Sequence, residues 1–148
     1  MMELSDISAL KAYSINVGSV FKMKLYPEDG VKPKNEGETS RDKRLIVIGK
    51  TDDSVVVGYL LINSEINDKL LMLIGPYQHC IHPDQYDFLN GKDRYIDCYR
   101  IKELTFERLL KDGTYIGQVE TDDIAEAMRL AKASPVNNNY TLKKFSLL

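Results

Sequence analysis

Polar side chains at the ends of predicted strands are the residues of this chain best suited to chemistry. Arg44 precedes an apolar run, Asn63 and Ser64 follow another, and Asp97 or Arg100 lies in a later alternating stretch. Cleavage of RNA through its own 2′-hydroxyl needs a base for that proton, an acid for the leaving 5′-oxygen and donors for the charge at phosphorus, and it needs no metal. An arginine suits the last role because its guanidinium binds two phosphate oxygens at once. On residue type alone, an arginine that begins an edge strand is more often solvated or ion-paired.

Metal-capable residues gather in a second place, at His79-Cys80-Ile81-His82, with Asp84 nearby and Cys98 farther along. In a strand the two histidines would point to opposite faces, and neither a Cys-x-x-Cys nor a His-Glu-x-x-His spacing is present. We therefore expect no metal site and no cofactor, but ordinary core cysteines beside turn histidines. A cysteine nucleophile with a histidine base has no specific spacing to support it either.

The strongest structural pattern is a hairpin with Arg44 at its entrance and Asn63 at its exit. Leu45–Ile48 and Val55–Ile62 are rich in β-branched residues, which favour strands, and the polar residues 49–54 between them suit a turn. Before the hairpin, residues 18–26 alternate apolar and polar side chains, as a half-buried strand does. The charged loop at residues 28–43 is either solvated without a role or a flap over a site.

The remaining predicted elements are short. The patterns predict a short helix within residues 1–14, strands at 77–81, 94–101 and 113–119, a strand or helical turn at 86–89, a helix at 105–111 with Thr105 as N-cap, and an amphipathic helix at 121–133 with a Thr or Asp N-cap. Residues 136–148 are expected to be a loosely packed tail. Short strands with only short helices between them indicate a mainly β fold (β+α), built as a small antiparallel barrel rather than from βαβ units.

Size and composition agree with one globular domain. The 148 residues are 43% hydrophobic and 28% charged, with a net charge of −2 and two cysteines. This charge gives no general attraction to DNA or to a membrane surface, so binding of a polyanion would depend on a local patch. No apolar run is long enough to span a bilayer, and neither a disulfide framework nor a secretory leader is recognised, so a cytoplasmic location is expected.

The order and spacing of several segments resemble the PemK/MazF toxin family. Gly18-Ser19-Val20 resembles the family's opening Gly-Asp-Ile/Val, and residues 43–48, KRLIVI, resemble its Lys-x-Arg-Pro-x-x-Val-Ile motif. Residues 95–101 and 115–119 resemble its late strand and the Ile-Gly-x-Leu segment before its final helix. The resemblance covers residues 18–135, which would form the core of a single domain at 1–148, with 1–17 as an N-terminal extension.

The family resemblance implies a fold, an activity and partners. The fold would be an SH3-like barrel with a C-terminal amphipathic helix, and the activity would be metal-independent cleavage of single-stranded RNA. An antitoxin protein and a second copy in a homodimer would be the partners. Two alternatives stay open: a non-catalytic barrel that binds RNA or a protein, and a structural protein that associates with itself.

Carried over residue by residue, the resemblance also implies site roles. Arg44 matches the family's catalytic, RNA-contacting arginine and would stabilise phosphate charge, with Ser64 or Asn63 as a donor. The family's late-strand acid aligns closer to Tyr99, and Asp97, two positions earlier on the same face, is the candidate base. The cations expected to bind RNA are Lys22, Lys24, Lys43 and Arg100. Leu45 stands where the family has proline, and residues 62–64, Ile-Asn-Ser, stand where it has its catalytic threonine.

Overall fold

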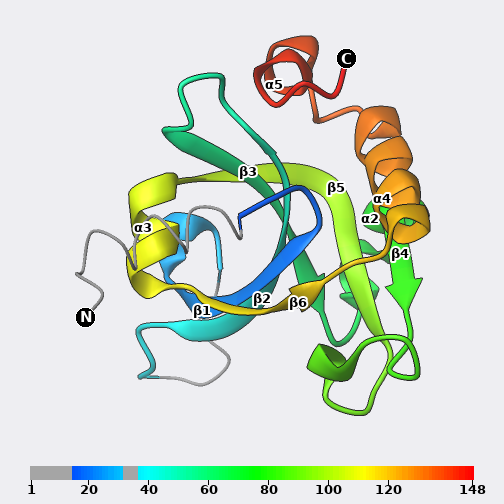
Figure 1. Cartoon of the computed structure of the whole chain (residues 1–148). Helices are drawn as coiled ribbons and strands as arrows, with labels where there is room; N and C mark the ends of the chain where they lie inside the picture. The colour runs from blue at the N-terminus through cyan, green and yellow to red at the C-terminus, as the bar shows by residue number, and fades with distance from the viewer. Residues whose placement is uncertain (1–14, 32–36) are drawn as a thin grey trace, which may run out of the picture.

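Six antiparallel strands form one curled sheet in the computed structural model, which describes residues 15–31 and 37–148 (Figure 1). The strands are β1 (Ser19–Leu25), β2 (Arg41–Lys50), β3 (Val56–Asn63), β4 (Gln78–Ile81), β5 (Arg94–Thr105) and β6 (Thr114–Gln118). Their order is β4-β5-β3-β2-β1-β6, so the predicted hairpin lies in the middle of the sheet. The helical segments are η1 (Pro27–Asp29), η2 (Asp68–Leu70), α2 (Leu71–Ile74), η3 (Gly75–Tyr77), η4 (Asp87–Leu89), α3 (Phe106–Asp112), α4 (Thr121–Ala133) and α5 (Asn139–Lys144). The predicted fold class, a mainly β, SH3-like antiparallel barrel with a C-terminal amphipathic helix, is confirmed.

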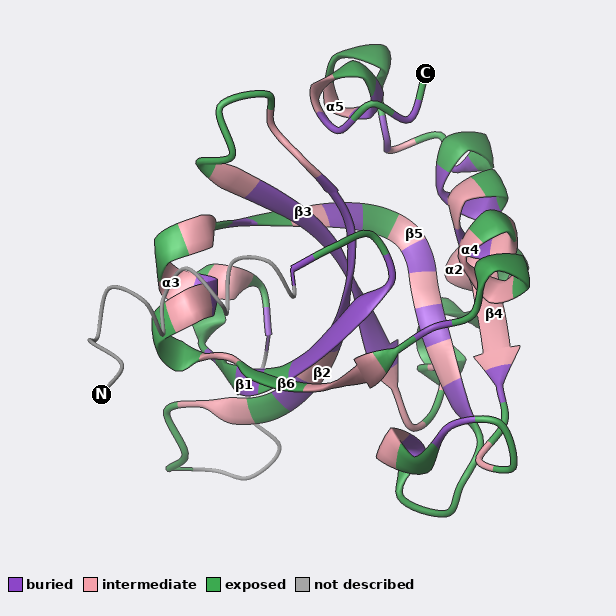
Figure 2. Ribbon diagram, viewed as in Figure 1, coloured by how far each residue is buried: buried purple, intermediate pink, exposed green. Residues whose placement is uncertain are grey.

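Each face of the sheet carries its own hydrophobic core, because alternate residues of a strand point to opposite sides. The core on what we call the α4 face contains Ile46, Ile62 and Ile96 together with buried residues of α4. The core on what we call the α3 face contains Leu45 and Leu61 together with Leu109 of α3. Figure 2 shows the consequence along β2 and β3, whose central residues are buried without interruption since both of their faces are covered.

Irregularities in strand pairing help to curl the sheet. The pairing of β2 with β3 shifts between Val47 and Gly49, and the pairing of β3 with β5 shifts between Tyr59 and Leu61. Extra residues on one strand of a pair bend that strand and increase its twist. The irregularity in β5, between Asp97 and Lys102, also explains the mixed faces predicted for residues 94–101, because within it the α4 core takes both Cys98 and Ile101, which differ in alternation.

The two predicted helices at 105–111 and 121–133 are present. The side chain of Thr105 accepts a hydrogen bond from the backbone N–H of Arg108, which confirms it as the N-cap of α3. Helix α4 buries Ala127, Leu130 and Ala131 against the sheet. Its predicted N-cap was wrong: Glu120 holds that position, and its side chain makes no capping hydrogen bond.

The segment after α4 is firmly packed, so the prediction of a loosely packed tail at 136–148 was wrong. Asn137 is buried, and its side chain accepts a hydrogen bond from Ile101 N at 2.9 Å and donates one to Ala131 O at 2.8 Å. Asn138 then caps α5 by accepting from Thr141 N at 2.9 Å. Asn137 and Asn138 therefore anchor the connection between α4 and α5.

Phe145 docks the end of this segment onto the central hairpin. Its side chain is 2% exposed and belongs to the α4 core. A Cβ added to Gly49 would lie 2.7 Å from the Phe145 Cβ, and one added to Gly58 would lie 2.9 Å from its ring. Two glycines on neighbouring strands thus leave the space that Phe145 occupies, which we call the glycine seat. Figure 1 shows the C-terminal end lying beyond the top of α4.

Several connections differ in detail from the prediction. Residues 86–89 contain a single helical turn, η4, and residues 71–74 form the short α2, whose Met72 is 96% exposed. The loop predicted at 28–43 is shorter, because η1 covers its start and β2 already begins at Arg41. The helix predicted within residues 1–14 lies outside the described residues, as does the middle of that loop, residues 32–36.

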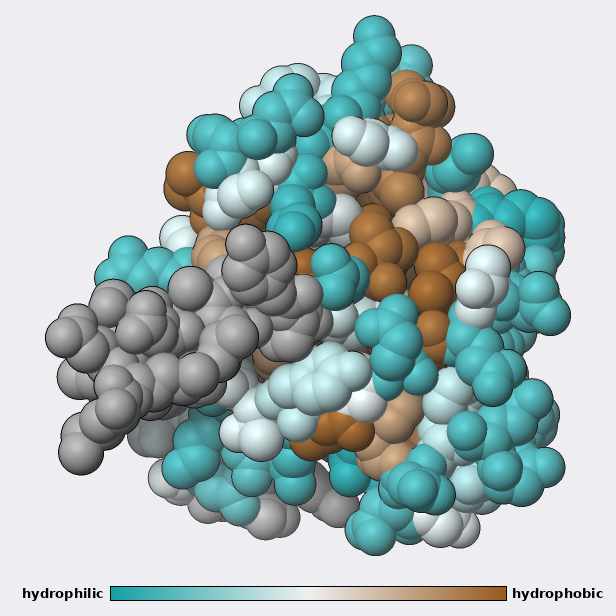
Figure 3. All heavy atoms as spheres, in the orientation of Figure 1, coloured by the Kyte–Doolittle hydropathy of each residue, from teal (hydrophilic) through white to brown (hydrophobic). Residues whose placement is uncertain are grey.

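The surface in the view of Figure 3 is largely polar, with apolar side chains gathered near its centre, between α4 and the strands. In the part of the chain that the structure describes, no helix combines the length and apolar character required to cross a bilayer.

Candidate active site

A pocket of about 710 Å³ opens where β2, β3 and β5 meet β4 and the segment before it. Asn63, Ser64 and Asp97, three of the four catalytic candidates, line it together with Lys43. The other lining residues are Gly30, Val31, Arg41, Leu61, Glu65, Ile66, Asn67, Asp68, Lys69, Leu70, Ile74 and Gln78. The structure therefore brings one predicted RNA-binding cation to the same place as three predicted catalytic residues.

Strand pairing explains why these side chains meet. Arg44 pairs with Ile62 across β2 and β3, so the next residues outward are Lys43 and Asn63. Asp97 pairs with Leu61 on one side and with Gln78 on the other. Successive residues of a strand point to opposite faces of the sheet. Lys43, Asn63, Asp97 and Gln78 therefore point to the same face as Leu45 and Leu61, the α3 face, whereas Arg44 and Ile62 point to the other.

Hydrogen bonds fix the orientation of the polar groups in the pocket. Lys43 Nζ donates to Asn63 Oδ1. Asp97 Oδ1 accepts from Gln78 Nε2 at 2.8 Å and from Tyr99 N at 3.1 Å. Both of these donors use the same carboxylate oxygen, so among the described residues none donates to Oδ2. That oxygen is available to take a proton from a substrate hydroxyl.

Lys43 is the most perturbed cation in the pocket. It is 8% exposed, and burial lowers its pKa to about 8, with further lowering from the nearby positive charges of Arg41 and Arg94 and an opposing effect from Asp97. At neutral pH most of the Lys43 side chains carry a proton that is given up more readily than that of an ordinary lysine. A buried group with a pKa near the working pH suits proton transfer as well as charge stabilisation.

One wall of the pocket is held by an ion pair below it. Arg108 of α3 donates two hydrogen bonds to the Asp29 carboxylate, at 2.6 and 2.8 Å, and holds the pKa of Asp29 below its usual range. Gly30, which follows, has φ of 81° and lines the pocket with Val31. The bidentate pair thus fixes the backbone turn that forms this wall.

Arg44, the fourth catalytic candidate, does not line the pocket. Its Nε donates to Phe88 O at 2.9 Å, while Arg94 Nε donates to Leu89 O at 2.8 Å. The two arginines therefore hold the η4 turn from the α4 face. Neighbouring residues of a strand point to opposite faces, so a position one residue away from Lys43 is on the wrong side of the sheet for the pocket.

The other predicted RNA-binding cations are dispersed. Lys22 and Lys24 line a separate depression beside α3 and β6, and Arg100 lines another with Glu28 and Asp29. Arg41 and Gln78 are polar residues of the pocket that had no predicted site role, and the sequence placed Arg41 in the charged loop. No sequence motif marks Gln78, whose place depends on the pairing of β4 with β5.

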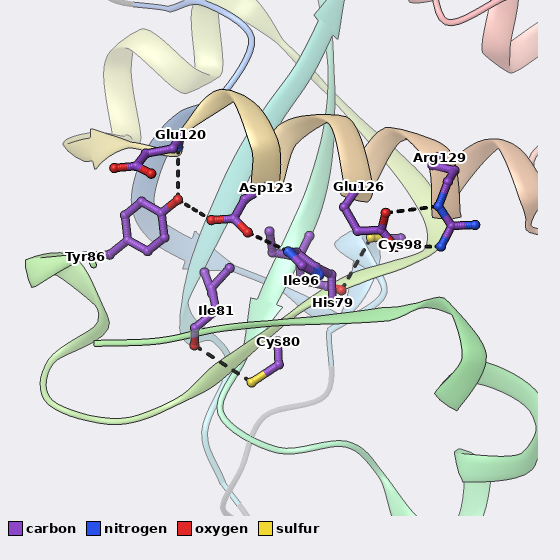
Figure 4. Close-up of polar contacts among 10 residues, drawn as sticks. All are labelled: His79, Cys80, Ile81, Tyr86, Ile96, Cys98, Glu120, Asp123, Glu126 and Arg129. Atoms are coloured by element: carbon purple, nitrogen blue, oxygen red, sulfur yellow. Dashed lines mark hydrogen bonds and ion pairs between the residues drawn. The ribbon is translucent and has the colours of Figure 1, made fainter. Parts of the chain in front are cut away.

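A second polar cluster lies on the opposite face, beneath α4 (Figure 4). His79 Nε2 and Asp123 Oδ1 are 2.7 Å apart, and Tyr86 donates its hydroxyl proton to Asp123 Oδ2. The Tyr86 hydroxyl also accepts from Glu120 N at 3.0 Å, and burial raises the pKa of Tyr86, with a further contribution from the Asp123 hydrogen bond. These contacts tie β4 and the η4 loop to the first turn of α4, which makes the cluster a structural link.

We expect Asp123→Ala to lower the free energy of unfolding by about 1–3 kcal/mol, because two partly buried partners lose their acceptor. Urea denaturation measures this loss. Asp122→Ala is the matched control, since Asp122 is an exposed acid in the same helical turn and should cost no more than about 0.5 kcal/mol. Equal losses for the two variants would show that only charge near the helix terminus matters.

Comparison with known proteins gives a likeness to solved structures and none to a sequence family. No family model matches the chain, and no curated protein sequence matches it. A chain in the crystal structure of MazE-MazF from Deinococcus radiodurans superposes with a TM-score of 0.54 at 10% sequence identity, covering 82% of this chain and 95% of that one. At this identity the likeness bears on the fold alone, and it agrees with the resemblance found in the sequence. The chain therefore has a fold similar to that of a chain in this MazE-MazF structure.

Proposed function

We propose that this protein is an endoribonuclease that cleaves single-stranded RNA in the pocket beside Lys43, without a catalytic metal. The observation that carries the proposal is the buried Lys43 ammonium, with its pKa of about 8, in one pocket with Asn63, Ser64 and Asp97. A base, an acid and polar donors are the groups that RNA cleavage by its own 2′-hydroxyl requires. The toxin–antitoxin-related fold supports the same reaction class by analogy only.

In the proposed reaction the Asp97 carboxylate takes the proton of the 2′-hydroxyl as the 2′-oxygen attacks phosphorus. The bond from phosphorus to the 5′-oxygen breaks, and Lys43 gives its proton to that leaving oxygen. The products are a 2′,3′-cyclic phosphate and a free 5′-hydroxyl. Arg41 and the polar groups of Asn63 and Ser64 stabilise the charge on the phosphoryl oxygens. Arg41 and Lys43 thus take over the phosphate role that the resemblance implies for Arg44.

The direct test is incubation of the purified protein with single-stranded RNA in the presence of a chelator. We expect cleavage to give cyclic phosphate ends, and an RNA with 2′-deoxy nucleotides at the cleaved positions to stay intact. RNA that survives prolonged incubation with protein of verified fold would overturn the proposal.

The rate of cleavage should fall above pH 8, because the acid form of Lys43 disappears as pH rises through its pKa of about 8. A pH series of single-turnover rate constants measures this limb. In Lys43→Arg the guanidinium stays protonated up to about pH 10 and beyond, so the falling limb should vanish or move to much higher pH. A wild-type rate that does not change between about pH 7 and pH 10 would contradict the role of Lys43 as an acid.

A non-catalytic binding module is the second candidate, and the exposed apolar residues beside the pocket favour it. Leu70, Leu71, Met72 and Leu73 are all exposed, and Leu70 also lines the pocket. Such a run is typical of a protein-binding surface. Two results together would favour a binding module. RNA would stay intact, and the wild type would capture one protein stoichiometrically, whereas Met72→Asp would not.

The proposed activity would operate in the cytoplasm and would be controlled by an antitoxin protein, with a second copy of the chain as a homodimer partner. Light scattering after size-exclusion chromatography measures the mass in solution. A monomeric mass at micromolar concentration would exclude the homodimer without affecting the catalytic proposal.

A further inference from the structure

Three potential metal ligands converge at the far end of the β4–β5 hairpin. The Sγ of Cys80, a ring nitrogen of His82 and a carboxylate oxygen of Asp93 lie within 4.8 Å of one another, and His82 Nδ1 is 2.9 Å from Asp93 Oδ1. This cluster lies on the same sheet face as the candidate pocket but nearer to the end of the hairpin. None of its residues takes part in the proposed cleavage.

Strand register brings the three residues together. Cys80 pairs with Tyr95 and Ile81 pairs with Arg94, so the next pair outward is His82 with Asp93. Cys80 and His82 share a face because they are two residues apart. His79, on the other face, is taken by Asp123, and Figure 4 shows it directed to α4 while Cys80 points away from that helix. The two histidines do point apart, as expected, but the third ligand comes from the opposite strand.

We propose that Cys80, His82 and Asp93 bind a single divalent zinc ion, with an exchangeable water in the fourth position. Thiolate, imidazole and carboxylate are the three side-chain types that zinc accepts, and bonds of about 2.0–2.3 Å in a tetrahedral site set the ligand atoms about 3.5 Å apart. The His82–Asp93 separation of 2.9 Å is shorter than this value, and no pair of ligand atoms is more than 4.8 Å apart. His82 and Asp93 have side chains that are 55% and 56% exposed, so both can adjust without movement of the strands.

Zinc fits this site better than a hard cation does. Magnesium and calcium prefer oxygen ligands throughout, whereas only one of these three ligands is an oxygen. In the free protein, burial raises the pKa of the Cys80 thiol, so zinc binding releases the thiol proton to solvent as the Sγ–metal bond forms.

Zinc at this site would close the loop between His82 and Asp93. That loop carries η4, whose carbonyl groups are held by Arg44 and Arg94 on the other face. An ion that bridges both ends of a loop stabilises the folded chain because it binds the native arrangement only. Zinc at this site would therefore stabilise the folded β4–β5 hairpin.

Cobalt titration of the metal-free full chain tests the proposal. With one equivalent of Co²⁺ we expect a thiolate-to-cobalt charge-transfer band and the intense visible bands of tetrahedral cobalt, both removed by one equivalent of Zn²⁺. Cys80→Ser should abolish the charge-transfer band, and His82→Ala should weaken zinc affinity by about 100-fold or more. Zinc should also raise the thermal midpoint of the wild type and not that of Cys80→Ser.

The chain provides matched controls for the cysteine and histidine ligands, because it has only two cysteines and two histidines. Cys98→Ala and His79→Asn should both retain the cobalt bands, since Cys98 is buried in the α4 core and His79 faces α4. If the core variant does not fold, His79→Asn still provides the comparison. A wild type without the charge-transfer band at one equivalent, or a band that persists in Cys80→Ser, would overturn the proposal.

Discussion

Replacement of Lys43 by methionine should lower the rate constant of RNA cleavage by about 100- to 1,000-fold, the usual cost of losing a general acid or a transition-state donor. Methionine keeps an unbranched apolar side chain in the buried part of the site and removes only the ammonium group. Because that group lies in the pocket with Asp97, its loss removes both the proton for the leaving oxygen and positive charge near the phosphate. Single-turnover cleavage of a labelled RNA measures the change.

Arg44→Met is the discriminating comparison, since Arg44 is the adjacent cation on the same strand and its side chain binds Phe88 O on the other face. We expect it to lower stability and to leave the cleavage rate of the folded protein within a few-fold of wild type. Circular dichroism must show both variants folded at the assay temperature. A larger loss of activity in Arg44→Met than in Lys43→Met would return the catalytic role to Arg44.

Phe145→Ala should lower the free energy of unfolding by about 3–5 kcal/mol, the range measured for removal of a buried aromatic ring. The ring is 2% exposed and packs in the glycine seat formed by Gly49 and Gly58. Its removal leaves a cavity that two glycines cannot fill. Urea denaturation followed by circular dichroism measures the loss.

Tyr140→Ala is the matched control for Phe145→Ala, because Tyr140 is an aromatic residue of the same segment that is 74% exposed. It should change the free energy of unfolding by no more than about 0.5 kcal/mol. Gly58→Ala tests the seat from the other side, since the added Cβ would meet the ring at 2.9 Å. If Phe145→Ala proves as mild as Tyr140→Ala, the tail is not anchored through this ring.

Local sequence patterns predicted most of the strands and helices, because those elements depend on near neighbours. Alternation identified β1 and β5, β-branched runs identified β2 and β3, and Thr105 marked the start of α3. The packing of residues 136–148 was not predicted, because it depends on contacts with residues distant in the sequence. Asn137 accepts a hydrogen bond from β5, and Phe145 packs against Gly49 and Gly58. No local signal distinguishes such an asparagine from a linker residue.

The candidate site was predictable in part for a related reason. The ends of neighbouring strands meet at one edge, and so Asn63, Ser64 and Asp97 share a pocket. Lys43 and Arg44 are adjacent in β2, so their side chains point to opposite faces and only one of them can face the pocket. A motif that is aligned only to within one residue cannot decide which one it is. Gln78 depends on which strand pairs with β5, and a single sequence does not record that pairing.

Residues 139–147 act as a ligand that is covalently linked to its own binding site, because Phe145 occupies the glycine seat on the central hairpin. A short connection holds such a ligand at an effective concentration on the order of millimolar, so modest contacts suffice to keep it bound. A chain that lacks this segment would present a vacant seat on the central hairpin. A separate peptide with the same residues should then restore the thermal midpoint in a concentration-dependent way, which would report the intrinsic affinity of the tail for the barrel.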